Sequence, residues 1–384
     1  MRFPEFSGEW EMASLQDIAA INPKSDQLQN TFIYIDLEAV EKGELRKIQE
    51  IMREEAPSRA QRVINNNDIL FQCVRPYQKN NYIHKILNTS NQQWVASTGY
   101  AQIRTTESPN YIYHLLNTDG FNRKVMVRCT GSSYPAINSE DLATIRFYYT
   151  PDKKEQFKIS RLLDLIDERI ATQNKIIEDL KKLKSAIIER HYNQAEKQTV
   201  FIADLGEPFN VGNLSKDDLS ETGKPCIIYG ELFTTYGETI SQVESHTNKK
   251  EGMTLSKKGD LLFPTSTTVD AISLIAPSFI NIDGVILGGD MFGIHINPNY
   301  NAQYLSYYFN HIANRQLAKY AKGSTIIHLH YTDIENAKLL LPSLEEQNRM
   351  AKCLVSLDAK INIENIFISL LKSQKIYFLY QMFI

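Results

Sequence analysis

The longest regular pattern of hydrophobic and polar positions runs from residue 152 to residue 192. This stretch lacks Gly and Pro and is rich in helix-favouring residues, so it predicts one long α-helix. Its apolar positions recur at spacings of three and four, as in a coiled coil. This first helix seam comprises Ile159, Leu163, Ile166, Ile170, Ile177, Leu180 and Ile187. Gln173 and Lys184 stand at two positions where the pattern requires an apolar residue.

A second copy of the pattern follows 191 residues later. Glu364 and Lys375 interrupt it at the positions that correspond to Gln173 and Lys184. The second helix seam comprises Met350, Leu354, Leu357, Ile361, Ile368, Leu371 and Phe378. Because both interruptions agree, the pattern indicates an internal repeat and a second long helix.

The repeat extends upstream of both helices, at a spacing of 192 residues. The segment Asp68 to Phe71 corresponds to Asp260 to Phe263, and Gly131-Ser132-Ser133 corresponds to Gly323-Ser324-Thr325. A proline and a Glu-Gln pair mark the start of each helix. The chain therefore consists of two tandem units, each a globular part followed by a long helix.

Symmetry between the units predicts the topology. The first helix leads from one globular part to the other, so an equivalent second helix must lead back, antiparallel to the first. We expect an α+β fold: two pseudo-symmetric globular domains joined by two long antiparallel coiled-coil helices, each spanning roughly 60 Å, with the chain ends close together. The expected segments are domain 1 at 1–151, a central helix at 152–193, domain 2 at 194–341 and a C-terminal helix at 342–384.

Gln173 and Glu364 have a predicted role in this arrangement. If the helices overlap symmetrically, both residues lie near the pseudo-twofold axis. There a polar layer inside an apolar seam fixes the register of the helices at a cost in stability.

Each globular part mixes strand signals with helix signals. In the first, residues 64–74 predict a turn of three Asn and a buried strand, and residues 111–116 predict a short amphipathic helix. In the second, residues 260–263 predict a strand and residues 302–322 a Tyr-rich helix. The loops differ more between the copies than the framework does, which favours two recognition modules with different targets.

Composition and charge restrict the possible functions of the chain only weakly. The net charge is −3, and residues 194–341 carry 11 Lys+Arg against 16 Asp+Glu, so any nucleic-acid affinity must come from local patches or from a partner. With no targeting segment and no apolar run of about 18 residues, we expect a cytoplasmic protein without membrane contact. The cysteines lack C-x-x-C pairing, and we expect all four to be buried, reduced and inert. They are Cys73, Cys129, Cys226 and Cys353.

Signatures of catalysis are missing from the sequence. It contains no phosphate-binding loop of the G-x-x-x-x-G-K-[ST] type, no G-x-G-x-x-G fingerprint and no N-P-P-Y tetrapeptide. His328 and His330 have a spacing that would suit a metal, but no third ligand accompanies them, so we expect no metal site. Asp68 and Asp260 each precede a hydrophobic strand, which favours a structural role in a turn over a catalytic one.

Polar loops carry the candidate DNA contacts, because Arg and Lys bind phosphates while Arg, Asn and Gln also bind base edges. The candidates in the first globular part are Arg53, Arg59, Arg62, Arg75, Lys79 and Asn80. Those in the second are Tyr229, Glu231, Lys249, Lys250, Thr265, Lys319, Lys322, Ser324 and His328. For any one of them, a solvated surface residue is the alternative interpretation.

The repeated pattern resembles the specificity subunits of type I restriction-modification systems. The segments Gly323 to Leu329 and Leu341 to Gln347 are similar to typical segments of that family, as are Tyr229 to Leu232 and Gln381 to Ile384. The segment Thr150 to Lys154 departs from the family's usual double-proline stretch.

This resemblance implies that two target-recognition domains each recognise half of a bipartite site in double-stranded DNA, while the helices set the gap. It also implies partners: two methyltransferase (M) subunits on the helices and endonuclease/translocase (R) subunits. The catalytic residues, S-adenosylmethionine and ATP would belong to those partners. The resemblance therefore implies a chain that is not an enzyme and needs no cofactor of its own.

Three questions stay open at this point. The exposed helix positions Arg161, Glu168, Lys175 and Lys182 are either a docking face for the methyltransferase or a solvated face. The chain could instead be a two-headed coiled-coil adaptor that binds proteins, which its acidic balance favours. It could also be an enzyme whose site has no sequence signature.

Overall fold

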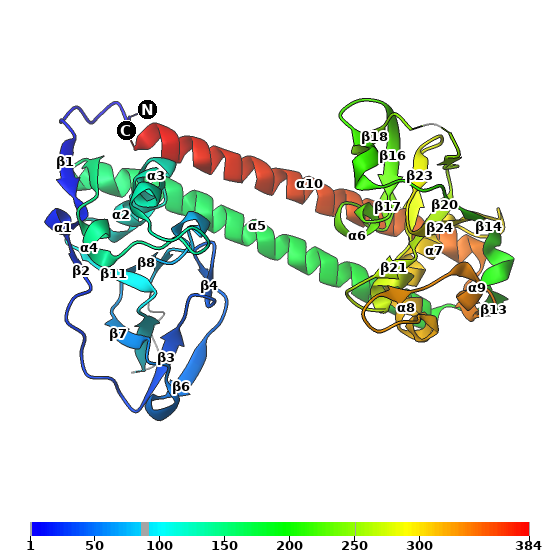
Figure 1. Ribbon diagram of the computed structural model, residues 1–384, viewed down its shortest axis with the longest axis horizontal. Helices are drawn as coiled ribbons and strands as arrows, with labels where there is room; N and C mark the ends of the chain where they lie inside the picture. Colours follow the sequence, from blue (N-terminus) through cyan, green and yellow to red (C-terminus); the bar gives the residue numbers. More distant parts are fainter. Residues whose placement is uncertain (1, 86–91, 250, 384) are drawn as a thin grey trace. The chain divides into compact units, whose positions relative to one another are not determined.

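The computed structural model describes residues 2–85, 92–249 and 251–383. Two long helices organise it, α5 (Lys153–Gln194) and α10 (Leu344–Met382), drawn in green and red in Figure 1. Both confirm the helices predicted from the hydrophobic pattern. The Asp152 carboxylate accepts a hydrogen bond from the Lys154 N–H at 2.8 Å and so caps the start of α5.

The chain forms two compact units. Unit 1 contains Met1–Asn174 and Ile366–Ile384, and unit 2 contains Lys175–Asn365. Each unit therefore holds one globular part, one half of α5 and one half of α10. The predicted segments place their limits at the expected ends of the two helices. The compact units instead divide both helices near their middles.

In unit 1, the two helix halves run antiparallel. The Arg169 guanidinium lies over the ring of Phe367, and the Asp167 carboxylate pairs with Lys375 at 2.6 Å. Leu163, earlier on α5, shares a core with Met382, later on α10. Trp10 also contacts Phe383, with ring centroids 6.5 Å apart, so the two terminal segments are neighbours as predicted.

In unit 2, the helices are again antiparallel. Lys184 pairs with Asp358 at 2.6 Å, and His191 with Glu346 at 3.0 Å. Together with the sheets described below, this confirms the predicted α+β architecture of two repeated domains joined by antiparallel helices.

The described residues of unit 1 form two four-stranded sheets, four short α-helices and two 3-10 helices, at Arg53–Glu55 and Pro76–Gln78. The first sheet has the order β2 (Ala19–Ile21), β11 (Tyr100–Thr105), β8 (Ile69–Gln72), β9 (Tyr82–Ile83), and the second has the order β6 (Gln49–Met52), β3 (Thr31–Ile35), β10 (Gln93–Ser97), β7 (Ala60–Ile64). Two strand pairs, β1 (Glu11–Ser14) with β12 (Arg146–Tyr149) and β4 (Val40–Glu41) with β5 (Glu44–Leu45), complete the strands. The helices are α1 (Leu15–Ile18), α2 (Pro109–Leu116), α3 (Asp119–Arg128) and α4 (Ser139–Ala143).

Unit 2 repeats this plan with two five-stranded sheets. The first has the order β14 (Gly206–Asn210), β24 (Met291–Ile296), β20 (Asp260–Pro264), β22 (Ser278–Ile280), β17 (Thr239–Ile240), and the second has the order β15 (Leu219–Ser220), β18 (Ser245–Thr247), β16 (Lys224–Ile228), β23 (Ile286–Gly288), β19 (Thr254–Leu255). Two pairs, β13 (Gln198–Phe201) with β26 (Lys338–Leu341) and β21 (Ser266–Thr267) with β25 (Ile327–His328), complete the strands. The helices are α6 (Glu231–Thr234), α7 (Ala302–Tyr308), α8 (Asn314–Leu317) and α9 (Tyr331–Ile334).

The glutamine of each Glu-Gln pair joins its helix to the adjacent domain. Gln156 accepts a hydrogen bond from the Ser108 N–H at 3.0 Å and donates to the Thr150 carbonyl at 2.8 Å. Gln347 accepts from the Asn301 N–H at 2.9 Å and donates to the carbonyl of Pro342, two residues before α10 begins, also at 2.9 Å. Because both side chains are buried, these bonds fix where each helix leaves its domain.

Asp68 and Asp260 hold equivalent turns. Asp68 accepts from the Asn65 N–H at 2.7 Å and pairs with Arg104, while Asp260 accepts from the Lys257 N–H at 2.8 Å and contacts His295. These contacts support the structural interpretation of both carboxylates.

Two expectations need correction. Cys353, on α10, is exposed, and Cys129, the extended residue directly after α3, is only partly buried because it packs at the edge of the unit 1 core; all four cysteines are free. The helix predicted to Lys322 ends at Tyr320, since Ala321 is extended, and a π-helical turn at Phe309–Ala313 interrupts it. Across the described residues, no helix is long and apolar enough to cross a membrane.

Candidate nucleic-acid interface

The two units present the same pair of loops next to the central strand of the main sheet. In unit 1, Ala136 forms bridges with Val74 and Thr130. In unit 2, the residues 192 positions later make the same contacts, since β21 pairs with β25 and Lys322 bridges to His328. Each unit thus closes a short loop that begins with the Gly-Ser pair of the repeat.

Glycine is required at the start of both loops. Gly131 has φ +87° and Gly323 has φ +115°, values that side chains rarely adopt. A Cβ atom at Gly323 would lie 2.1 Å from the carbonyl oxygen of Ile326. This backbone turns residues 132–134 and 324–326 outward, and all of them are exposed.

In unit 1, the loops bring Arg75 together with an aromatic side chain that the sequence analysis did not select. Arg75 has φ +55°, and its guanidinium lies 4.4 Å from the ring centroid of Tyr134. Tyr134 and Tyr77 are both largely exposed. A cation beside exposed aromatic rings and Ser hydroxyls offers contacts to phosphates and bases.

Two other candidates of the same loop region are engaged within the protein. The Lys79 ammonium donates to the Asn117 carbonyl at 3.1 Å and pairs with Asp119 at 2.6 Å. The Asn80 side chain accepts from the Lys42 N–H at 2.9 Å. Both side chains therefore hold the loop in place.

Arg62 lies on β7 of the second sheet of unit 1, and Arg53 and Arg59 lie in the connection between β6 and β7, so none of the three belongs to this loop pair. Arg53 and Arg59 are exposed. Arg62, on β7, is partly buried, and burial lowers the pKa of its guanidinium. Its Nε and Nη1 atoms have no hydrogen-bond partner among the described residues.

In unit 2, the structure brings four candidates together. Thr265 accepts a hydrogen bond from the Leu329 N–H at 2.9 Å, directly beside the β25 residue His328. Lys322 and His328 exchange two backbone hydrogen bonds, and exposed Ser324 lies in the loop between them. The rings of His328 and His330 stack, and both residues are exposed.

Lys322 and Lys319 differ in the contacts that their ammonium groups make within the protein. The Lys322 ammonium pairs with Asp333, and this ion pair lowers the pKa of the Asp333 carboxyl. Lys319 is exposed and lies over the ring of Tyr320. Among the described residues, no group of three His, Cys, Asp or Glu side chains is placed to hold a metal ion.

Three further candidates in unit 2 lie next to strands of the other sheet: Tyr229 follows β16, Glu231 begins α6 and Lys249 follows β18. Glu231 caps a turn, because its carboxylate accepts from the Ile228 N–H at 2.9 Å and from the Ser245 hydroxyl. Lys249 donates to the Asn213 carbonyl at 2.7 Å, whereas Tyr229 is exposed. Lys250 lies outside the described residues.

The predicted helix seam is buried along most of its length. Ile170, Leu180 and Leu357 are partly buried, and the buried seam positions are Ile159, Leu163, Ile166, Gln173, Ile177, Leu354, Ile361, Glu364, Ile368 and Leu371. Near the end of α5, Ile188 is more deeply buried than the predicted Ile187. A helix with 3.6 residues per turn drifts in this direction from a strict seven-residue repeat.

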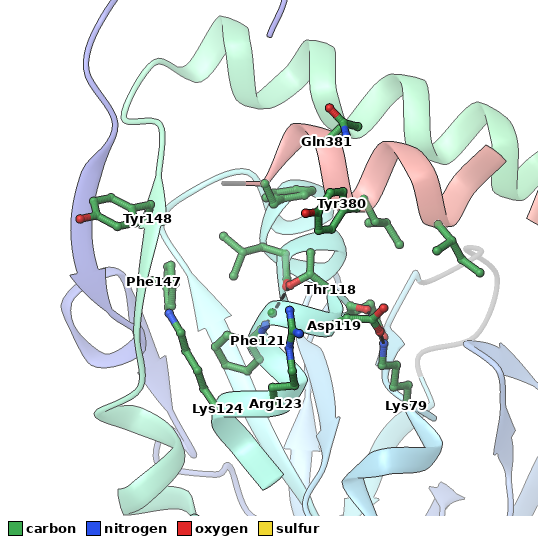
Figure 2. A pocket seen from close by; sticks show the side chains of 16 residues that line it. Lys79, Thr118, Asp119, Phe121, Arg123, Lys124, Phe147, Tyr148, Tyr380 and Gln381 are labelled. Carbon is green, nitrogen blue, oxygen red and sulfur yellow. Dashed lines mark hydrogen bonds and ion pairs between the residues drawn. The ribbon is translucent and has the colours of Figure 1, made fainter. Parts of the chain in front are cut away.

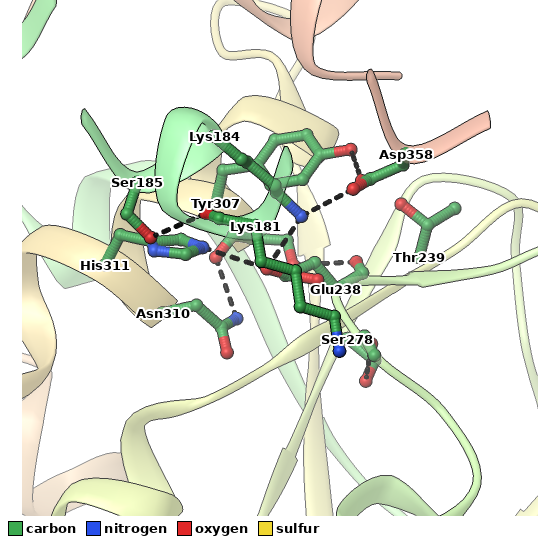
Figure 3. A network of polar contacts seen from close by, with 12 residues as sticks. Lys181, Lys184, Ser185, Glu238, Thr239, Ser278, Tyr307, Asn310, His311 and Asp358 are labelled. Atoms are coloured by element: carbon green, nitrogen blue, oxygen red, sulfur yellow. Dashed lines mark hydrogen bonds and ion pairs between the residues drawn. The ribbon is translucent and has the colours of Figure 1, made fainter. Parts of the chain in front are cut away.

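Lys184, one of the polar seam positions, is the centre of a buried network in unit 2. Figure 3 shows its ammonium between the carboxylates of Glu238 and Asp358, at 3.0 and 2.6 Å. His311 contacts Glu238, and Tyr307 donates to Asp358 at 2.5 Å. Burial alone would raise the pKa of Glu238, but His311 and Lys184 hold it at about 2.

The sequence model of a known family matches this chain twice, at residues 7–182 and 194–372. That family is described as the type I restriction modification DNA specificity domain. The chain belongs to this family. The two matches coincide with the two copies of the repeat, and they identify a DNA specificity subunit of a type I restriction-modification system. The adaptor interpretation is therefore not favoured.

One known relative and two solved structures are similar to this chain over most of its length. The chain is 23% identical over 399 residues to the MjaVIII specificity subunit of Methanocaldococcus jannaschii, covering 95% of this chain and 89% of that protein. The S subunit of M. genitalium has a similar fold, with a TM-score of 0.60, 14% identity, and coverage of 98% and 96%. A chain solved in work on type I R-M complex assembly has a TM-score of 0.60 and 19% identity, covering 97% of both chains.

Sequence reasoning selected Ser324 in one Gly-Ser loop but missed two large exposed side chains of these loops, Tyr134 and Ile326. Tyr134 and Ile326 occupy the third position after each glycine. The repeat had already located both loops, but nothing in the sequence showed that these apolar side chains are exposed.

Proposed function

We propose that each globular domain recognises one half of a bipartite DNA site, and that the two loops beside its main sheet contact the bases. The observation that carries this proposal is the repeated loop pair. Its backbone bridges and its Gly-Ser start are equivalent in both units, but other side chains differ: Arg75 and Tyr134 in one unit, Thr265 and His328 in the other. A shared frame with different side chains suits two different half-sites.

Exposed cations outside these loops would contact the phosphate backbone. Arg53, Arg59 and Lys319 suit this role because their side chains reach solvent. Arg62 suits it less, because much of its guanidinium is buried. Lys79, Asn80, Glu231 and Lys249 have intramolecular partners, so we assign them to loop structure. The net charge of −3 implies that partners supply further phosphate contacts.

The long helices would set the number of base pairs between the half-sites and bind the methyltransferase subunits. Arg161, Glu168, Lys175 and Lys182 are all exposed on α5. Their only ion pairs among the described residues lie within α5, Arg161 with Glu168 and Lys182 with Glu178. Exposed pairs of this kind contribute little stability, so a partner can replace them at low cost.

In this function the chain itself is not a catalyst. Methyl transfer with S-adenosylmethionine and ATP-driven translocation would reside in two M subunits and in the R subunits, and this chain would hold no cofactor. We place the assembly in the cytoplasm, where such a complex meets cellular DNA.

Exchange of the loops tests the proposal. The chain is co-expressed with a methyltransferase subunit of its system, and methylated adenines in host DNA are mapped by single-molecule sequencing. We expect a bipartite motif with a fixed gap. Changing residues 131–134 and Arg75 should alter one half of the motif, and changing residues 265–268 and 324–326 should alter the other half. If both halves change together, or neither changes, the assignment of loops to half-sites is wrong.

A further inference from the structure

The backbone of Arg75 is held in a strained conformation by the Gly-Ser loop of unit 1. Arg75 directly precedes Pro76 and has φ +55° and ψ +53°, a left-handed conformation that strains most residues other than glycine. Its N–H donates to the Pro135 carbonyl at 2.8 Å, and Val74 forms a bridge with Ala136. Strain of this kind persists only where the surroundings fix the backbone, and it is concentrated at functional sites.

The segment that follows Arg75 is anchored to the rest of unit 1. Gln72, the buried last residue of β8, donates to the Gln78 side chain at 3.0 Å. Figure 2 shows Lys79 beside Asp119, with which it forms an ion pair at 2.6 Å. The backbone on both sides of Arg75 is therefore fixed, so its side chain starts from a defined place.

The Arg75 guanidinium makes no polar contact within the described part of the chain. Arg2 and Arg104, in the same unit, each donate two hydrogen bonds to one carboxylate. Among the described residues, no hydrogen bond or ion pair engages the guanidinium of Arg75, which instead lies 4.4 Å from the ring centroid of Tyr134. Tyr134 is 64% exposed. A guanidinium over a ring is held in place, but its N–H donors stay free for another molecule.

The equivalent positions of unit 2 lack this arrangement. The residue 192 positions after Arg75 is Thr267, which is buried and whose hydroxyl accepts from the Val269 N–H at 3.2 Å. Tyr134 corresponds to Ile326, which has no aromatic ring. A DNA group that requires this guanidinium is therefore expected in one half-site and not at the equivalent place of the other.

We propose that Arg75 recognises a guanine in the half-site of domain 1, and that Tyr134 positions its guanidinium. This inference rests on the proposed function and names a base within it. Guanine presents O6 and N7 side by side in the major groove, and a guanidinium with free donors binds both acceptors at once. A phosphate contact needs neither a strained backbone nor an adjacent ring, because it tolerates a mobile side chain. The fixed guanidinium thus favours the base edge.

The test uses the complex of this chain with a methyltransferase subunit of its system. Methylated adenines in host DNA give the motif, and exchange of residues 1–151 for the domain of a relative identifies the half that domain 1 determines. That half should contain a G·C pair. Arg75→Gly, which suits the positive φ, should make this one position degenerate and leave every other position unchanged.

Binding to duplexes that carry the mapped motif gives the magnitude. Fluorescence anisotropy should show that the original complex prefers G·C to A·T at this position by about tenfold or more, and that Arg75→Gly reduces the preference to about twofold or less. In Arg75→Gln, the preferred base should change from G to A, because a Gln amide binds adenine N6 and N7.

Tyr134 and Arg59 provide the controls. Tyr134→Phe keeps the ring and should keep the motif, whereas Tyr134→Ser should lower the preference for G·C by about threefold or more. Arg59→Ala removes an exposed cation outside the loop pair, so it should change the affinity for both duplexes equally and leave the motif unchanged.

Three outcomes would overturn the inference: a domain 1 half-site without a G·C pair, an unchanged motif in Arg75→Gly, or equal weakening of both duplexes by Arg75→Gly, which would identify a phosphate contact. Failure of the proposed function differs from these, because exchange of residues 1–151 would then alter neither half of the motif or both. If Arg75→Gly does not fold, methylation is lost at every site, and the comparison of Tyr134→Phe with Tyr134→Ser decides.

Discussion

Lys184 and Lys375 occupy equivalent positions of the two helices, yet their surroundings differ. Each pairs with an Asp of the other helix, and those partners, Asp358 and Asp167, are also 191 residues apart. The Lys184 side chain is 7% exposed and also contacts Glu238 and Tyr307, whereas that of Lys375 is 23% exposed. The repeat thus preserves the ion pair, but only unit 2 builds it into a buried network.

The largest expected effect is the loss of Lys184. In Lys184→Met, the carboxylates of Glu238 and Asp358 remain in a poorly hydrated site without their cation. We expect unfolding free energy to fall by about 3 kcal/mol, measured by denaturant titration. Lys375→Met should cost about 1 kcal/mol or less, because water reaches that pair. Equal losses would show that burial does not distinguish the two sites.

Lowering the pH should destabilise unit 2, because it protonates the Glu238 carboxylate. Its pKa is about 2 in the folded protein, below its usual 4.5, so its stabilising effect is complete above about pH 4.5 and is lost as pH falls towards 2. The loss should approach about 3 kcal/mol. Hydrogen exchange of unit 2 as a function of pH measures it. Glu238→Gln should flatten the profile, whereas the exposed control Glu221→Gln should leave it unchanged.

The Gly-Ser loops allow the same comparison. Gly323→Ala should destabilise unit 2 by about 2 kcal/mol, because its φ is +115° and the new Cβ meets a carbonyl at 2.1 Å. Gly131→Ala should cost about 1 kcal/mol, since the corresponding contact in unit 1 is 3.0 Å. Calorimetry of both variants checks the order, and a larger loss for Gly131→Ala would contradict it.

The smallest expected effect is a gain in stability. Gln173 and Glu364 are buried polar residues of the helix seams, 2% and 9% exposed, and each has apolar seam residues on either side. Replacing both with Leu should raise the melting temperature, by a gain of about 1 kcal/mol, if their role is to fix register. An unchanged or lower melting temperature would contradict that role.

The sequence located many residues of the candidate site but did not show which contacts their side chains make. The Glu-Gln pairs marked helix starts, but only the structure shows Gln156 and Gln347 joining each helix to its domain. Arg75 was selected as a cation, and its aromatic neighbour Tyr134 was not. Lys79 and Glu231 were selected for their polar side chains, which the structure shows paired inside the protein. Local sequence cannot distinguish a polar group that faces solvent from one that meets a distant partner.

The sequence by itself determined the duplication, the two long helices, their antiparallel direction and the positions of the Gly-Ser loops. These features follow from periodicity and repetition, which are local and additive along the chain. The tertiary structure alone decided which seam lysine is buried and which cations remain exposed. It also decided that apolar side chains of α10 such as Leu370 and Tyr380 are exposed. Burial and pairing depend on contacts between residues far apart in sequence, and the hydrophobic periodicity does not predict such contacts.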